Sequence, residues 1–156
     1  MKSPKLNNQT NETAIDTQIK NALAADGPVL AAIRAAFPET LAVYAFGSRI
    51  NANANANADS DLDLSVLVAG YADPLRLWEL SGELADIVGC PVDLLDMRAA
   101  STVMQYQILQ TGRRLWGSEL EVGLFEVYVL SEKTELDTAR AGLLADIQTR
   151  GSVYGR

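Results

Sequence analysis

The most informative absence in this sequence of 156 residues is histidine, of which there is none. Without histidine, Ser-His-Asp and Cys-His catalysis, a histidine general base and nearly all zinc chemistry are excluded. Any catalysis must therefore use carboxylates, hydroxyls, lysine, arginine or backbone amides. Carboxylates favour Mg²⁺, a hard ion that prefers oxygen ligands.

Cysteine, long apolar runs and positive charge are also in short supply. The only cysteine, Cys90, allows no intramolecular disulfide, which fits a reducing cytoplasm. No window approaches the roughly 18 apolar residues of a membrane span, and the polar N-terminus lacks the apolar segment of a signal peptide. We therefore expect a cytoplasmic protein with no membrane contact. The net charge of −7 argues against broad nucleic-acid binding, which rests on Lys and Arg.

What is present is an ordinary globular composition, 48% apolar and 21% charged, in a chain long enough for one domain with a sizeable core. Apolar spacing predicts two helices between residues 14 and 37 that are separated at Asp26-Gly27-Pro28. The expected elements that follow are a strand at 41–46, a strand at 61–68, a helix at 74–88, a strand at 91–97, a helix at 101–110, a short edge strand at 113–116 and mostly helix over 119–149. This order predicts an α/β (α+β) fold, a sheet flanked by helices.

The chain divides into one domain with additions at both ends. We expect a flexible tail at 1–12, the domain at 13–118, a C-terminal helical segment at 119–150 and a tail at 151–156. The last helical segment carries an apolar stripe wide enough to face a partner as well as the core: Leu136, Ala139, Leu143, Leu144 and Ile147. Trp78 and Trp116 are predicted to lie in the core. Residues 51–58 alternate Asn and Ala, a pattern that indicates a mobile loop.

Two aspartates share one face of the strand predicted over 61–68. Asp61 and Asp63 alternate with apolar side chains there, so both carboxylates point the same way, about 6–7 Å apart at their roots. Like charges at that separation raise each other's pKa unless a cation intervenes. A solvated polar strand face is the alternative explanation. The strongly apolar residues 66–68 favour a core strand instead.

Two further features belong with this pair. Asp93 lies on the next predicted strand and joins the pair if the two strands are neighbours. Gly47 and Ser48 follow an apolar strand, where glycine lets a phosphate approach the backbone and serine adds a hydroxyl donor. Taken singly, Asp93 is better explained as an exposed strand residue and Gly47-Ser48 as a turn. Together with Asp61 and Asp63 they indicate a metal-assisted site for nucleotidyl transfer.

This arrangement resembles the minimal nucleotidyltransferases, or MNT proteins, of the DNA polymerase β superfamily. The similarity rests on Gly47-Ser48-Arg49, on DSDLDL and on VDLL, and it covers the order of elements from about residue 14 to 117. It implies a nucleotidyltransferase fold with a small mixed sheet over 13–118, together with Mg²⁺ and a nucleoside triphosphate, usually ATP. The site residues that it implies are Gly47, Ser48 and Arg49 for the nucleotide and Asp61, Asp63 and Asp93 as catalytic metal ligands, Asp93 also being the base.

Many such small proteins are antitoxins encoded beside a HEPN-domain ribonuclease toxin, and members transfer AMP to a tyrosine hydroxyl of the toxin. The resemblance therefore implies an antitoxin adenylyltransferase whose substrate and partner in a hetero-oligomer is a HEPN toxin, with no direct nucleic-acid contact. One alternative is a non-catalytic antitoxin that neutralises the toxin by binding. Another is a small-molecule nucleotidyltransferase that modifies antibiotics, which usually carries an extra helical domain.

The loop after Ser48 departs from the family pattern. Ile50 and Asn51 stand where family loops often carry an alanine and a second arginine, so we expect weaker phosphate contacts there. Arg113 and Arg114 are candidates to supply positive charge from elsewhere in the chain. A solvated edge strand is the favoured explanation of that pair of arginines.

Overall fold

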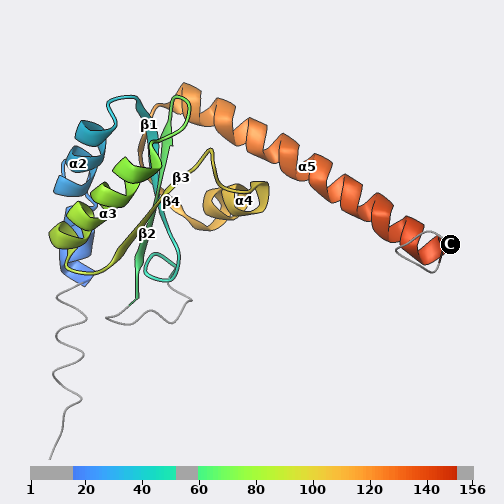
Figure 1. Cartoon of the computed structure of the whole chain (residues 1–156), viewed down its shortest axis with the longest axis horizontal. Coiled ribbons are helices and arrows are strands. Elements are labelled where there is room, and N and C mark those ends of the chain that lie inside the picture. The colour runs from blue at the N-terminus through green and yellow to red at the C-terminus, as the bar shows by residue number, and fades with distance from the viewer. Residues whose placement is uncertain (1–15, 52–59, 151–156) are drawn as a thin grey trace, which may run out of the picture.

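The computed structural model describes residues 16–51 and 60–150 (Figure 1). Residues 16–22 are helical. They are followed by α2 (Pro28–Ala36), β1 (Thr40–Phe46), β2 (Leu62–Val68), α3 (Pro74–Val88), β3 (Val92–Asp96), α4 (Thr102–Thr111), β4 (Arg113–Gly117) and α5 (Glu119–Arg150). This order confirms the predicted α/β fold. The tails predicted at 1–12 and 151–156, and all of the Asn-Ala stretch after Asn51, lie outside the described residues.

The four strands form one mixed sheet in the order β3-β2-β1-β4. β1 runs antiparallel to β2 and to β4, whereas β2 and β3 run parallel. The strand that carries Asp63 is therefore flanked by β1, which leads into Gly47, and by β3, which carries Asp93. β2 and β3 are neighbours, so the condition under which Asp93 lies beside the other two aspartates is met.

Helices cover both faces of the sheet and create two cores (Figure 1). The alternation along β2 decides which side chains enter each core. Leu62, Leu64 and Val66 are fully buried in the core beneath α2 and α3. Leu67 points the other way, into the core beneath α4 and α5. Because β2 is buried on both faces, its polar residues are held by a rigid strand.

The predicted helix ends of α3 are confirmed by its backbone. Asp73 occupies the N-cap position and Pro74 opens the helix, although no side-chain hydrogen bond from Asp73 caps it. Gly89 ends the helix in the left-handed region with a φ of +79°, a conformation that glycine adopts without steric cost. The chain then enters β3 with Asp93 at its second position.

The predicted burial of the two tryptophans is wrong for Trp78, whose side chain is 76% exposed. The buried face of α3 is set by Leu77, Leu80 and Leu84, and a residue next to Leu77 is rotated about 100° away from that face. Trp116 is half-buried against the first core, with the Arg34 guanidinium 4.5 Å from the ring centroid.

The helix α5 is a single helix of 32 residues. Its first half contacts the sheet through the buried side chains Val122, Phe125 and Val129. Figure 1 shows the second half projecting away from the rest of the described chain. Leu143 and Leu144 on this half are exposed. None of the helices in the described ranges is long and apolar enough to span a membrane.

Leu64→Ala is expected to lower the free energy of unfolding by about 2–5 kcal/mol, because it leaves a cavity in a fully packed strand. Leu144→Ala is the matched control, since that leucine is 59% exposed, and it is expected to change stability by less than about 0.5 kcal/mol. Urea unfolding followed by circular dichroism measures both. Equal effects of the two substitutions would contradict the assignment of β2 to the core.

Candidate functional site

The strand β1 ends in a single helical turn that begins at Gly47. The Gly47 carbonyl accepts hydrogen bonds from the backbone N–H groups of Ile50 at 3.2 Å and Asn51 at 3.0 Å. Gly47 has a φ of +82°, in the left-handed region that favours glycine. A Cβ atom at this position would also overlap the Asp63 carboxylate. The backbone conformation therefore favours glycine, and the absence of a side chain lets the turn lie directly against Asp63.

The strand register places the carboxylates beside this turn. Asp63 is paired with Phe46 on β1 and with Asp93 on β3. Asp61 precedes β2 by one residue. Asp63 is half-buried, whereas Asp61 and Asp93 are exposed. The structure thus brings Gly47 and all three predicted aspartates to one end of the sheet.

The half-buried carboxylate of Asp63 is electrostatically strained. Burial raises the pKa of Asp63 most, and the neighbouring charges of Asp93 and Asp61 raise it further. Each of these effects disfavours the ionised form. A cation bound among the three carboxylates would relieve this repulsion.

The three carboxylates are the type of ligand that a metal ion such as Mg²⁺ prefers, but their side chains do not converge on one point. Within residues 16–51 and 60–150, no three acidic, histidine or cysteine side chains converge closely enough to form a metal site. Asp63 and Asp93 nevertheless lie on adjacent strands, whose backbones are about 4.8 Å apart. Three carboxylates form an all-oxygen donor set, which fits Mg²⁺.

Arg49 connects the turn to its surroundings. Its side chain is only 4% exposed and forms an ion pair with Asp16 at 3.5 Å. Its Nε donates a hydrogen bond of 2.6 Å to the carbonyl of Ser60, the residue before Asp61. Arg49 therefore ties the Gly47 turn to the start of the carboxylate-bearing strand. Its predicted contact with a nucleotide stays a prediction.

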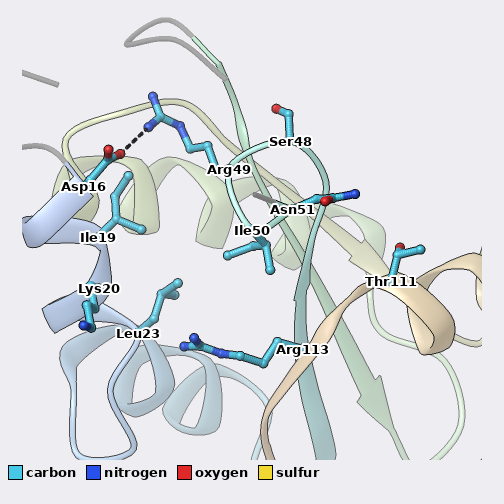
Figure 2. A pocket seen from close by; sticks show the side chains of 10 residues that line it. All are labelled: Asp16, Ile19, Lys20, Leu23, Ser48, Arg49, Ile50, Asn51, Thr111 and Arg113. Atoms are coloured by element: carbon cyan, nitrogen blue, oxygen red, sulfur yellow. Dashed lines mark hydrogen bonds and ion pairs between the residues drawn. The ribbon is translucent and has the colours of Figure 1, made fainter. Parts of the chain in front are cut away.

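A cavity of about 580 Å³ opens on the other side of the turn (Figure 2). Ser48 lines it together with Lys20 from the N-terminal helical residues and Arg113 from β4. Figure 2 shows the Arg113 side chain reaching toward the helical residues that carry Lys20 and Leu23. Sequence reasoning missed Lys20, since a lysine on the exposed face of a short helix carries no local signal of a site.

The two neighbouring arginines of β4 lie in different surroundings. Arg113 is paired with Ala45 and lines the cavity, whereas Arg114 is paired with Tyr44. Burial, followed by the charge of Glu126, raises the pKa of Tyr44 to about 12, and the positive charge of Arg114 opposes this shift. Of the two arginines, only Arg113 lines the cavity that Ser48 also lines.

Comparison with known proteins gives consistent matches. Residues 30–120 match the family model described as polymerase beta, nucleotidyltransferase. The chain is 33% identical over 122 residues to the protein adenylyltransferase MntA of Shewanella oneidensis, covering 78% of this chain and 86% of that protein.

Two solved structures extend these matches. A chain from a toxin–antitoxin structure with AMP-PNP is 32% identical, with a TM-score of 0.67 over 77% of this chain and 95% of that chain. A chain from the structure of tri-AMPylated Shewanella oneidensis HEPN toxin in complex with MNT antitoxin is also 32% identical. Its TM-score is 0.62, and the match covers 77% of this chain and 92% of that one.

Asp63→Asn is expected to raise the free energy of unfolding at pH 7 in metal-free buffer, because it removes a half-buried charge that Asp93 and Asp61 repel. The folded pKa of Asp63 is raised, so its ionisation costs no stability well below the ordinary carboxyl range. The cost sets in as the pH rises through the ordinary carboxyl pKa, where the unfolded chain ionises first, and it reaches its full size above the raised pKa of the folded state.

Chemical unfolding at pH 3 and pH 7 measures this difference, with the exposed Asp26→Asn as control. We expect Asp63→Asn to stabilise the fold at pH 7 and to have little effect at pH 3. Stabilisation of the same size at both pH values would contradict the electrostatic explanation.

Proposed function

Since the chain belongs to the polymerase beta nucleotidyltransferase family, we propose that it is an antitoxin that transfers AMP from ATP to a tyrosine hydroxyl of a HEPN ribonuclease toxin. The observation that carries this proposal is the packing of the Gly47 turn against Asp63, which joins a phosphate-binding turn and a carboxylate cluster in one site. The similarity to the Shewanella oneidensis adenylyltransferase and to the structure with AMP-PNP supports ATP as the donor.

Each predicted site residue has a role in this reaction. Gly47 and Ser48 hold the phosphates through the N–H groups of the turn and the serine hydroxyl. Arg49, assigned to the nucleotide site, keeps this turn in place through its hydrogen bond to the Ser60 carbonyl. Asp61 and Asp63 are the ligands proposed for Mg²⁺, with Asp93 as the third. Bound Mg²⁺ supplies charge neutralisation and polarises the phosphoryl oxygens.

The transfer step is a displacement at the α-phosphorus of ATP. The tyrosine oxygen forms the new bond to that phosphorus, and the bond to the oxygen that bridges the α- and β-phosphates breaks. Pyrophosphate leaves with the electron pair of the broken bond. Asp93 accepts the proton of the tyrosine hydroxyl, since an exposed carboxylate beside Asp63 is within reach of an incoming protein substrate.

The proposal includes a complex with the toxin in the cytoplasm. We assign residues 13–118 to the nucleotidyltransferase domain and residues 119–150 to a helical segment that contacts the domain and the partner. The family match, which ends at residue 120, supports this division. Exposed large apolar side chains along α5 are available for such a contact: Leu120, Leu124, Val127, Tyr128, Leu130, Leu143 and Leu144.

Intact mass spectrometry of the toxin tests the activity. The chain is incubated with Mg²⁺, ATP and the HEPN protein of the neighbouring gene, and the toxin is expected to gain one or more AMP units. The double variant Asp61→Ala, Asp63→Ala is expected to lose this activity by at least about a hundredfold, since it removes both proposed metal ligands. The control variant Asp26→Asn, in an exposed turn, is expected to transfer AMP normally.

The same experiment separates catalysis from binding. A toxin that is silenced without any gain in mass would contradict the adenylyltransferase and favour an antitoxin that acts by contact alone. If the double variant still transfers AMP at the normal rate, the catalytic role assigned to Asp61 and Asp63 is contradicted. Chelation of the metal is expected to stop transfer by the unmodified chain.

A further inference from the structure

The strand that carries Asp93 lies at one edge of the sheet. In the order β3-β2-β1-β4, β3 pairs with β2 on one side and with no strand of the described residues on the other. The backbone groups on the outer side of such a strand are a template for an added strand. β4 is the opposite edge, and it begins with the exposed Arg113 and Arg114. β3 adjoins the strand of Asp63, whereas β1 separates β4 from that strand.

The outward backbone groups of β3 belong to Val92 and Leu94. The Met97 N–H donates a hydrogen bond of 2.9 Å to the Val66 carbonyl on β2, and the backbone groups of successive residues in a strand alternate between its two sides. The groups of residues 93 and 95 therefore face β2, and those of Val92 and Leu94 face away from it. Within residues 16–51 and 60–150, no hydrogen-bond partner is identified for these outward N–H and C=O groups.

An apolar groove continues this edge. A cavity of about 480 Å³ opens at the C-terminal end of β3, where α3 and α4 begin. Leu77 from α3, Leu95 from β3 and Met104 from α4 are among its lining residues. Met104 is 38% exposed, so the groove is open to solvent at that side chain. Leu95 lies two positions after Asp93 and on the same face of the sheet, so one added strand would pass both residues.

We propose that the outer edge of β3 binds an extended segment of the toxin, which adds to the sheet as a further strand and carries the acceptor tyrosine to Asp93. This inference rests on the proposed function, because it names how the protein substrate of that site is held. A residue opposite Asp93 on an added strand shares its face of the sheet, with the two backbones about 4.8 Å apart. A tyrosine there extends over the face on which Asp93 and Asp63 are paired. In this mode of recognition, main-chain hydrogen bonds supply affinity and side-chain pockets supply specificity.

Charge favours a basic segment at β3 over the same segment at β4. Asp61 and Asp93 are exposed beside the β3 edge, in a chain whose net charge is −7. The proposed partner is a ribonuclease, and binding of RNA phosphates requires Lys and Arg. A tyrosine segment with such neighbours is attracted by the aspartates and repelled by Arg113 and Arg114. Charge complementarity therefore selects the edge that carries the proposed base.

Hydrogen exchange of the full chain with its toxin tests the edge directly. Mass spectrometry of fragments that cover β3 and β4 measures amide exchange with and without toxin, with ATP omitted. We expect the amides of β3 to exchange at least about tenfold more slowly in the complex, because the outward N–H groups become hydrogen-bonded. The amides of β4 are expected to be unchanged. Protection of β4 without protection of β3 would overturn the proposal.

A substitution at Val92 tests the outward N–H itself. Val92→Pro removes this donor at the first position of the strand, where proline is tolerated. Val92→Ala is the matched control, since it also shortens the half-buried side chain but keeps the N–H. We expect Val92→Pro to bind the toxin about tenfold more weakly in calorimetry and to raise the KM for the toxin by a similar factor, the size of one backbone hydrogen bond whose partner is left unpaired. The KM for ATP is expected to be unchanged, and Val92→Ala is expected to match the unmodified chain.

The groove offers a second matched pair. Met104→Gln places a polar side chain in the groove, whereas Val103→Gln changes a neighbour that is 42% exposed and does not line it. We expect Met104→Gln to weaken toxin binding about fivefold, the effect of one lost apolar contact, and Val103→Gln to leave it unchanged. Equal effects of the two substitutions would contradict the part assigned to the groove.

Failure of this inference is distinguishable from failure of the proposed function. AMP transfer without protection of β3, or with equal KM values for the toxin in the two Val92 variants, would overturn strand addition and leave the adenylyltransferase standing. Protection of β3 and weaker binding by Val92→Pro, without any AMP transfer, would contradict the proposed function and support strand addition. Melting temperatures establish that the variants are folded. If Val92→Pro does not fold, hydrogen exchange of the unmodified chain decides the proposal.

Discussion

Gly47 lies against the carboxylate of Asp63, and the rest of the site depends on this contact. It requires a residue without a side chain in the left-handed region, so that the turn after β1 approaches β2 closely. The antiparallel register of β1 and β2 fixes which carboxylate the turn meets. Arg49 then ties the same turn to the residue before Asp61. The turn proposed to bind phosphate and the aspartates proposed to bind the metal, separated in sequence by a loop, thus become neighbours.

The carboxylate cluster is held in place by a strand that is stable for other reasons. Leu62, Leu64 and Val66 bury one face of β2 completely, and the same strand carries Asp63, whose pKa is raised by burial and then by the charges of Asp93 and Asp61. Such a cost at a functional site is common, because groups arranged for a charged ligand repel one another without it. Asp63 is half-buried on this packed strand, whereas Asp61 and Asp93 are exposed to solvent.

Most of the fold was predictable from local sequence patterns, whereas features that depend on long-range packing were not. The alternation along β2 and the extent of the helix predicted at 74–88 are each a property of neighbouring residues, and both predictions are correct. The exposure of Trp78 was missed because it depends on which stripe of α3 meets the sheet. Lys20 and Arg113 are more than ninety residues apart. Only the folded chain brings them to one cavity, so no sequence spacing indicates their shared position.

The central claim is that the Gly47 turn and the aspartates form one site for a metal-bound nucleotide. Anomalous diffraction from crystals of this chain with Mn²⁺ and AMP-PNP tests it most directly, because it locates the ion independently of the protein atoms. We expect the anomalous peak at the carboxylate oxygens of Asp61 and Asp63, with the triphosphate passing Gly47 and Ser48. A bound nucleotide whose metal and phosphates lie away from these residues would contradict the account.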